Sequence, residues 1–593
     1  MAISIAKKQS KKIRGGEIIS RMLASEGIKK VFGIIDGTYF GLYSTFEGNG
    51  IELVTPRHET SAAHMAGAYS RMTGEVGVCL ASNGPGVANI LPGIAVEQAE
   101  GHRVLVITSS RREGIAYPDR GGTFQCFPQV EVTRPMTKWS CAVPTVDRVA
   151  ELMRRAFRTL HTGRPGVVHI DVPESIMNGT YEPDPSWFRE PEHYRVLEPM
   201  EAPDAQVQKA ADMLLQAKNP VLHVGTGVIH AEAYKEVQEL AECLHSPITT
   251  SWSGRSAVDE RSPLAVPMLF VDVVNQARRE ADLIVVLGSR VGETDWWGKA
   301  PYWGRPGEQK TIQVDIDPEI LGNIRPVELP IYSDVKVFLQ KLLVVLRKRR
   351  HEMPLPGRRT FMEKLQSACE KRRAKLDRHL KDMSIPLHSA HVPDICQDVF
   401  DDDAIMVIDG GNTAIWANFY YQVRSPNTTL STFKMGMLGA GVSQALGVQA
   451  AHPERQVFCV IGDGAMGFHI QEIETAVRNN LPVIYLVLCD KQWGMVKINQ
   501  QFALKPVKTL LMKTLGPEET INADLHEIEF DQVARAMGAY GERVSDPRGL
   551  REALERAVST GLCSVIHVDV DPVKHMWAPE LKAFKDMHQE PAG

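Results

Sequence analysis

The sequence predicts an α/β protein built from open parallel sheets. The apolar runs Val457–Ile461 and Val483–Leu488 have the length of buried strands, and Gln471–Asn480 between them has helical composition. Further strands are predicted earlier in the chain, at residues 76–81, 281–288 and 311–315. With 593 residues, the chain is long enough for roughly three or four domains.

Acidic residues follow both strands of the strand-helix-strand unit. Gly462-Asp463-Gly464 closes the first strand, and Asp490 comes just after the second. In an open α/β sheet, ligands bind outside the carboxyl ends of the strands. Glycines let the backbone approach a phosphate, and Mg²⁺ usually takes carboxylates together with substrate phosphates. The unit therefore predicts a metal-diphosphate site.

This unit resembles the fingerprint of thiamine diphosphate (ThDP) enzymes, and other segments resemble their acetolactate synthase, benzaldehyde lyase and 2-hydroxyacyl-CoA lyase group. The matching segments, in the order of the family, are Pro56-Arg57-His58-Glu59, Ser82-Asn83-Gly84-Pro85-Gly86, Phe124-Gln125, Asp409-Gly410-Gly411-Asn412 and Gly436-Met437-Leu438-Gly439. The resemblance implies three open parallel-sheet domains: pyrimidine-binding, middle (like a nucleotide-binding fold) and diphosphate-binding. Breaks in composition place them at 15–180, 204–346 and 387–575, with a charged connector at 347–386 and a C-terminal tail at 576–593.

The resemblance also implies a cofactor site. Mg²⁺ would take the side chains of Asp463 and Asp490 and the backbone carbonyl of Gln492. Asp490 stands where the family has asparagine, which adds a negative charge that Lys491 and Lys497 are close enough in sequence to offset. The other implied ThDP contacts are Glu59, Gly84, Gly411, Asn412, Gly436, Leu438, Asp463, Gly464, Ala465, Asp490, Gln492 and Trp493.

Three residues are catalytic candidates. The resemblance assigns Glu59 as the carboxyl group that binds the cofactor's pyrimidine ring and so promotes loss of the proton at C2; a solvated first-turn glutamate is the alternative. Gln125 is expected to reach the bound intermediate, with a buried structural glutamine as the alternative. Asp36 is expected to border C2 as a protonated donor, or else to be an ordinary turn residue before Gly37.

The resemblance therefore implies a ThDP- and Mg²⁺-dependent lyase or transferase. We expect a carboligase or lyase that makes or breaks a carbon–carbon bond next to a carbonyl, acting on a 2-keto acid or 2-hydroxy-carbonyl substrate. A ThDP-dependent decarboxylase or a 2-hydroxyacyl-CoA lyase is the alternative, and a non-catalytic binding protein that kept the fold is a remote one. Because Val266–Val274 lacks the glycines expected for FAD, bound FAD or ADP in the middle domain is the less favoured expectation.

Composition predicts a cytoplasmic enzyme, and the resemblance implies a small-molecule carbonyl substrate. The net charge of −5 indicates no positive electrostatic field of the kind that attracts nucleic acid. No apolar run reaches the length of a membrane span, so no membrane partner is expected. Nine scattered cysteines without a CxxC pair indicate a reducing compartment. The segment Met1–Gly16 is expected to be a solvated tail. The resemblance implies a homodimer with shared active sites, which pairs further into a homotetramer.

Overall fold

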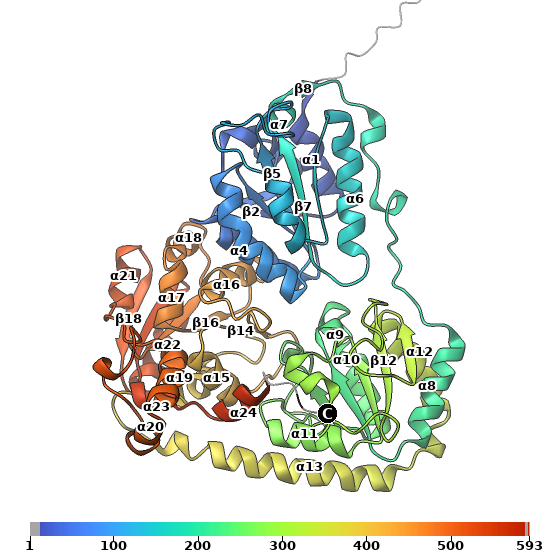
Figure 1. The fold of residues 1–593 in the computed structure, drawn as a ribbon, viewed down its shortest axis with the longest axis vertical. Helices are drawn as coiled ribbons and strands as arrows, with labels where there is room; N and C mark the ends of the chain where they lie inside the picture. Colours follow the sequence, from blue (N-terminus) through green and yellow to red (C-terminus); the bar gives the residue numbers. More distant parts are fainter. Residues whose placement is uncertain (1–11, 588–590, 592–593) are drawn as a thin grey trace, which may run out of the picture. The chain divides into compact units, whose positions relative to one another are not determined.

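The computed structural model describes residues 12–587 and Pro591 (Figure 1). The chain divides into two compact units, one of residues 1–198 and 446–451 and the other of residues 199–445 and 452–593. The first unit contains one extended parallel sheet and the second contains two. The predicted α/β class with three parallel sheets is therefore confirmed.

The first unit is built on six parallel strands. They are β2 (Lys30–Gly33), β3 (Glu52–Val54), β4 (Gly77–Ala81), β5 (Val104–Ser110), β6 (Trp139–Ala142) and β7 (Val167–Pro173), in the order β3-β2-β4-β5-β7-β6. Helices α1 (Gly15–Ser25) and α6 (Val149–His161) pack on one face, and α3 (Glu59–Thr73) and α4 (Pro85–Glu100) pack together on the other. Because both faces are covered, β4, β5 and β7 are buried along their whole length.

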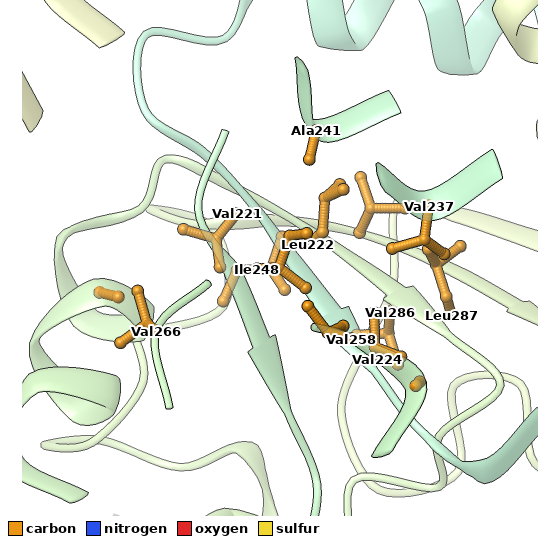
Figure 2. Packing of buried hydrophobic residues seen from close by; sticks show 14 of the residues in the cluster. Val221, Leu222, Val224, Val237, Ala241, Ile248, Val258, Val266, Val286 and Leu287 are labelled. Atoms are coloured by element: carbon orange, nitrogen blue, oxygen red, sulfur yellow. The ribbon is translucent and has the colours of Figure 1, made fainter. Parts of the chain in front are cut away.

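The middle sheet lies in the second unit. Its strands are β9 (Pro220–Val224), β10 (Ile248–Thr250), β11 (Leu283–Leu287), β12 (Lys310–Asp315) and β13 (Leu329–Tyr332), in the order β10-β9-β11-β12-β13. Helices α8 (Asp204–Gln216), α10 (Tyr234–Leu244) and α12 (Val335–Lys348) pack side by side, while α11 (Val271–Glu280) contacts the long helix α13 (Leu355–Leu376). Figure 2 shows Leu222, Val286 and Leu287 of the strands in one apolar cluster with Val237 and Ala241 of α10.

The third sheet repeats the strand order of the first. Its strands are β14 (Ile405–Ile408), β15 (Thr429–Leu430), β16 (Val457–Gly462), β17 (Ile484–Cys489), β18 (Tyr540–Val544) and β19 (Ser564–Asp569), in the order β15-β14-β16-β17-β19-β18. In all three sheets the first strand lies between the second and the third. The strand order reverses there, which is where such sheets bind ligands.

The helices of the third sheet carry several of the predicted site residues. They are α14 (His391–Val399), α15 (Asn412–Tyr420), α16 (Ala440–Ala451), α17 (Asp463–His469), α18 (Glu472–Arg478), α19 (Gly494–Leu504), α20 (Pro506–Met512), α21 (Phe530–Ala536) and α22 (Pro547–Thr560). None of the helices in the described part of the chain has both the length and the apolar composition of a membrane-spanning segment. All nine cysteines lie among the described residues and are free thiols.

The expected solvated tail at Met1–Gly16 is wrong for its last residues. Ile13 is buried in β1 (Ile13–Arg14), which pairs antiparallel with β8 (Thr180–Tyr181), and α1 already begins at Gly15. An apolar residue that gains a strand partner becomes part of the core, so the basic residues around it do not keep the segment in water. Residues 1–11 of the predicted tail lie outside the described residues, as do 588–590 and 592–593 of the predicted C-terminal tail.

Candidate active site

Two glycine-rich turns meet where the third sheet reverses its strand order. β14 is followed by Asp409-Gly410-Gly411-Asn412, and its neighbour β16 ends directly before Asp463. Gly410 has φ = +98°, and a side chain there would bring Cβ within 3.3 Å of the Gly462 nitrogen. This close approach of two backbones requires glycine and brings both predicted motifs to one edge.

The two predicted metal carboxylates come from neighbouring strand ends. Asp463 begins α17, and Asp490 follows β17, the strand paired with β16. Asp463 accepts hydrogen bonds from the N–H groups of Gly464 (2.7 Å) and Lys491 (2.8 Å). Burial raises the pKa of both carboxyl groups, and the charge of Asp463 raises the pKa of Asp490 further. Two desolvated carboxylates that repel each other are well suited to a divalent cation such as Mg²⁺.

Gln492 fixes the turn that carries the third predicted metal ligand, its backbone carbonyl. The side chain is buried, and its Nε2 donates to Asp490 Oδ2 (3.1 Å) and to the carbonyl of Pro572 (2.8 Å). The amide therefore orients one oxygen of Asp490 and ties the turn after β17 to the segment after β19.

The two lysines suggested by the sequence form ion pairs elsewhere. Lys491 Nζ lies 3.1 Å from a carboxylate oxygen of Glu527, and Lys497 Nζ lies 2.5 Å from one of Asp524. Each ammonium group is thus paired with a carboxylate other than those of Asp463 and Asp490. The added negative charge of Asp490 therefore favours a cation from solution.

Asn412 presents unpaired amide atoms at the same place. It is the first residue of α15 and only 4% exposed, and neither Oδ1 nor Nδ2 has a hydrogen-bond partner among the described residues. A Cβ on Gly494 would lie 2.7 Å from Asn412 Nδ2 and 3.1 Å from Asp490 Oδ2, so the amide and the carboxylate flank one glycine. Buried polar atoms are rarely left without partners. A bound diphosphate would supply one, at a helix N-terminus that favours anions.

The other predicted diphosphate contacts lie around this amide. A Cβ on Gly464 would lie 2.6 Å from the ring of Trp493, and a Cβ on Gly411 would lie 3.1 Å from Cβ of Met495. Ala465 is buried one residue further along α17. The structure thus brings Gly411, Gly464, Ala465 and Trp493 to the edge that carries the two carboxylates.

The segment with Gly436 and Leu438 is anchored to the same edge. Gly436 has φ = +58° and donates its N–H to Thr432 O (2.7 Å), and Leu438 is half-buried. A Cβ on Gly439 would lie 2.4 Å from Cβ of Phe468 in α17. The turn is therefore packed directly on the helix that begins with Asp463.

A cavity of about 440 Å³ adjoins Asp463 and Gly464. Phe468, Trp493 and Ile528 contribute to its largely apolar wall. Its volume and lining are typical of a site for a small molecule.

Glu59 lies at the start of α3 in the first unit. It is only 8% exposed, and its Oε2 accepts a hydrogen bond from Asn89 Nδ2 (3.0 Å). A Cβ on Gly86 would lie 3.4 Å from the other carboxylate oxygen, Oε1. The alternative of a solvated first-turn glutamate is therefore wrong, because the carboxylate is enclosed by the turn and helix that follow β4.

Hydrogen bonds connect the loops that carry the predicted substrate residues. Asp36 Oδ1 accepts from the Thr38 N–H (2.8 Å), and the Thr38 hydroxyl lies 2.6 Å from the Ser109 hydroxyl. Ser109 Oγ accepts from the Asn83 N–H (3.0 Å), and Asn83 Nδ2 donates to the carbonyl of Gln125 (2.9 Å). One oxygen of Asp36 is thus used to cap its own turn.

Gln125 is held against Gly84 in a strained conformation. Its φ of +54° is uncommon for a residue other than glycine, and a Cβ on Gly84 would lie 2.8 Å from Cβ of Gln125. The side chain of Gln125 is exposed, so the alternative of a buried structural glutamine is wrong. Gly84 itself has φ = +67°, which together with this contact explains glycine at that position.

The sequence did not single out Asn89 or Gln129, which hold Glu59 and Gly84. Asn89 Nδ2 donates to Glu59, and Gln129 Oε1 accepts from the Gly84 N–H (2.8 Å). A polar residue inside the apolar helical stretch 87–96 is a signal that could have revealed Asn89. Gln129 carries no such signal, because its partners come from three separate segments.

Aromatic side chains and Met587 pack together beside the end of β10 in the middle sheet. Trp296 stacks on Tyr302 with ring centres 3.6 Å apart. Met587, at the end of α24 (Leu581–Met587), is 2% exposed and packs in one cluster with Trp252 and Trp296. The space left between these side chains is about 10 Å³, which is at the lower limit for one water molecule.

Three domain families of the thiamine pyrophosphate enzymes match successive parts of the chain. Residues 13–132 match the N-terminal TPP binding domain of thiamine pyrophosphate enzymes, residues 207–342 match their central domain, and residues 409–568 match their C-terminal TPP binding domain.

Relatives with similar sequences cover nearly the whole chain. The acetolactate synthase isozyme 3 large subunit of Escherichia coli is 29% identical over 96% of this chain and 97% of that protein. The acetolactate synthase large subunit of Haemophilus influenzae is 28% identical over the same shares. A probable acetolactate synthase large subunit of Methanocaldococcus jannaschii is 26% identical over 95% of this chain and 93% of that protein.

Proposed function

Because the chain belongs to the ThDP-dependent enzymes of the acetolactate synthase group, we propose that it is a carboligase or lyase that joins or cleaves a carbon–carbon bond next to a carbonyl with ThDP and Mg²⁺. Its substrate is a 2-keto acid or a 2-hydroxy-carbonyl compound, and it acts as a lyase or transferase. The observation that carries the cofactor part of this proposal is the unpaired, buried amide of Asn412 beside Asp490.

Asp463, Asp490 and the carbonyl of Gln492 would hold Mg²⁺. The oxygen-only donor set and the desolvation of both carboxylates support this assignment. Asn412, Gly411, Gly464, Ala465 and Trp493 would hold the diphosphate, with Gly84, Gly436 and Leu438 as further ThDP contacts. At Gly411, Gly464 and Gly84 an added Cβ would lie within 3.1 Å of a neighbouring residue, which supports a close approach of the backbone at these three positions.

When bound, ThDP supplies a carbon nucleophile and an electron sink for bonds next to a carbonyl. Glu59 would hydrogen-bond the pyrimidine ring and hold a proton there. Its enclosed position supports this role, since Asn89 orients one carboxylate oxygen and leaves the other beside Gly86. Gln125 would orient the carbonyl substrate with its exposed amide, and Asp36 would border the reacting carbon from its turn.

The assembly is proposed as a homodimer, paired into a homotetramer, in which Glu59 of one subunit serves the cofactor held by Asp463 and Asp490 of the other. The resemblance to the family supports this arrangement. We place the enzyme in the cytoplasm, because its nine cysteines are free thiols. Bound FAD or ADP in the middle domain remains the less favoured expectation, because Val266–Val274 lacks the glycines expected for FAD.

The reaction is tested by supplying alternative substrates. Protein stripped of metal is assayed with pyruvate, glyoxylate, benzoin-type ketols and 2-hydroxyacyl-CoA, with ThDP and Mg²⁺ added singly and together. An acyloin or acetohydroxy acid product that needs both additions supports the carboligase. A free aldehyde from a 2-keto acid would select the decarboxylase, and cleavage of the thioester substrate would select the 2-hydroxyacyl-CoA lyase. No product from any of these substrates would favour the non-catalytic binding protein.

A further inference from the structure

The segment that leads into α5 (Gln129–Thr133) contacts Gly84 at two points, Gln125 and Gln129. At its first point, Gln125 lies against Gly84 with φ = +54°, and its carbonyl accepts from Asn83 Nδ2. At its second point, Gln129 Oε1 accepts the N–H of Gly84 at 2.8 Å. Only three residues separate Gln125 from Gln129, so the hydrogen bond of the Gln129 side chain restricts the backbone conformations that are open to Gln125.

Gln129 is itself held by a buried carboxylate. The side chain is 2% exposed, and its Nε2 donates to Asp171 Oδ1 (2.9 Å) and to the carbonyl of Ser109 (3.0 Å). Both donor protons and one acceptor position are thus used, which fixes which end of the amide faces Gly84. A rotated amide would place N–H against N–H at Gly84 and oxygen against oxygen at Asp171.

Asp171 acts as an acceptor for three side chains. It is fully buried in β7 and accepts hydrogen bonds from Thr108 Oγ1 (2.7 Å), Gln129 Nε2 and the Tyr117 hydroxyl. Burial raises its pKa to about 6, while the hydrogen bonds from Thr108 and its other donors act to lower it. The carboxylate is therefore ionised at neutral pH and paired with neutral donors.

The direction of the hydrogen bonds in this network also determines the tautomer of His169. Because Thr108 gives its only proton to Asp171, the 2.7 Å contact between Thr108 Oγ1 and His169 Nε2 assigns the proton to Nε2. His169 Nδ1 then has a single lone pair, which can accept from one of the two hydroxyls that lie 2.8 Å away, those of Thr133 and Ser140. Burial lowers the pKa of His169 to about 3, so the ring is neutral.

We propose that Gln129 is a positioning residue for the reaction: anchored on Asp171, it holds the Gly84 N–H and keeps Gln125 pressed on Gly84 in its left-handed conformation. The inference rests on the proposed function in one respect, that Gln125 faces the substrate. It adds a residue that contacts neither substrate nor cofactor and acts through Gln125.

A double-mutant cycle tests this role. Gln129→Leu removes all three hydrogen bonds of the side-chain amide at similar volume and is expected to lower kcat/KM on the order of tenfold to a hundredfold, the range for a misplaced catalytic group. In a Gln125→Ala background the same substitution should cost less than about threefold, because coupled residues are not additive. Equal losses in both backgrounds would show a general structural effect and overturn the proposal.

Gln98→Leu is the matched control. Gln98 Oε1 also accepts a backbone N–H, that of Val167 at 2.7 Å, but at the opposite end of β7. Its substitution should leave kcat/KM unchanged and should not couple to Gln125→Ala. If Gln129→Leu does not fold, Gln129→Glu keeps an acceptor for Gly84 but faces Asp171 with a second carboxylate, and it should couple to Gln125 in the same way.

Amide hydrogen exchange separates this inference from the proposed function. In Gln129→Leu, exchange should rise at Gly84 and across residues 119–128, while the buried strand 104–109 stays protected; Gln98→Leu should change neither. Unchanged exchange at Gly84 would refute the anchoring. If the wild type shows no ThDP-dependent activity but exchange rises as expected, the reaction assignment fails and the anchoring by Gln129 stands.

Discussion

Replacing Asn412 by alanine should weaken cofactor binding without weakening the fold. Neither polar atom of this buried side chain has a hydrogen-bond partner among the described residues. An unpaired buried polar group costs about 1–3 kcal/mol, and its removal should offset the packing lost by truncation. The free energy of unfolding of the metal- and cofactor-free protein should therefore change by less than about 1 kcal/mol.

The loss should appear when ThDP binds. A hydrogen bond to a charged partner contributes about 1.5–3 kcal/mol, and about 1.4 kcal/mol corresponds to a tenfold change in affinity. Asn412→Ala should therefore weaken ThDP binding by roughly 10- to 150-fold. Isothermal titration with ThDP at saturating Mg²⁺ measures this, and urea denaturation measures the stability.

Asn418 in the same helix provides the matched control. It is 3% exposed but fully paired: Nδ2 donates to Ala414 O (2.7 Å), and Oδ1 accepts from Arg255 (2.9 Å). Asn418→Ala leaves the buried guanidinium short of a partner, so it should destabilise the protein by about 1–3 kcal/mol and leave ThDP affinity intact. If Asn412→Ala behaved like Asn418→Ala in both measurements, Asn412 would be an ordinary structural residue.

Two further outcomes are expected at the same sites. Glu59→Gln should slow hydrogen–deuterium exchange at C2 of bound ThDP by at least about a hundredfold. Mixing Glu59→Gln chains with Asp463→Ala chains should restore part of the activity, because hybrid dimers would regain one complete site. No recovery after confirmed subunit exchange would exclude shared sites. Gly464→Ala would place Cβ 2.6 Å from the Trp493 ring and should abolish ThDP binding measured by titration, whereas Gly467→Ala in the same helix meets no atom within 4 Å and should bind normally.

The sheets and their ligand edges could be predicted because buried parallel strands have continuous apolar sequences. β16 and β17 lie where Val457–Ile461 and Val483–Leu488 predict them, and the acidic residues after them must share one edge. In the same way, the position of Glu59 at the start of a helix is determined by local sequence. A residue whose place depends only on where a strand or helix ends can therefore be located without a structure.

Residues whose role depends on partners from distant segments could not be predicted. Gln129 acquires its role only when β5, β7 and the turn after β4 converge on one amide. Ile13 was expected in solvent because its neighbours are basic, but its strand partner lies near residue 180. The ion pairs of Lys491 and Lys497 were equally hidden, since proximity to Asp490 in sequence does not decide which carboxylate an ammonium group meets.

Charge balance at the third sheet links the metal to the cofactor. Asp463 and Asp490 are two carboxyl groups where the resemblance to the family implies one, and the neighbouring lysines are paired with Glu527 and Asp524. An incoming diphosphate would meet both of these carboxyl groups, and the Asn412 amide beside Asp490 is a neutral group. A divalent cation cancels the charge of the acidic pair and attracts the diphosphate. ThDP should therefore bind this chain together with Mg²⁺ and not before it, because without the cation like charges face each other in a poorly solvated pocket.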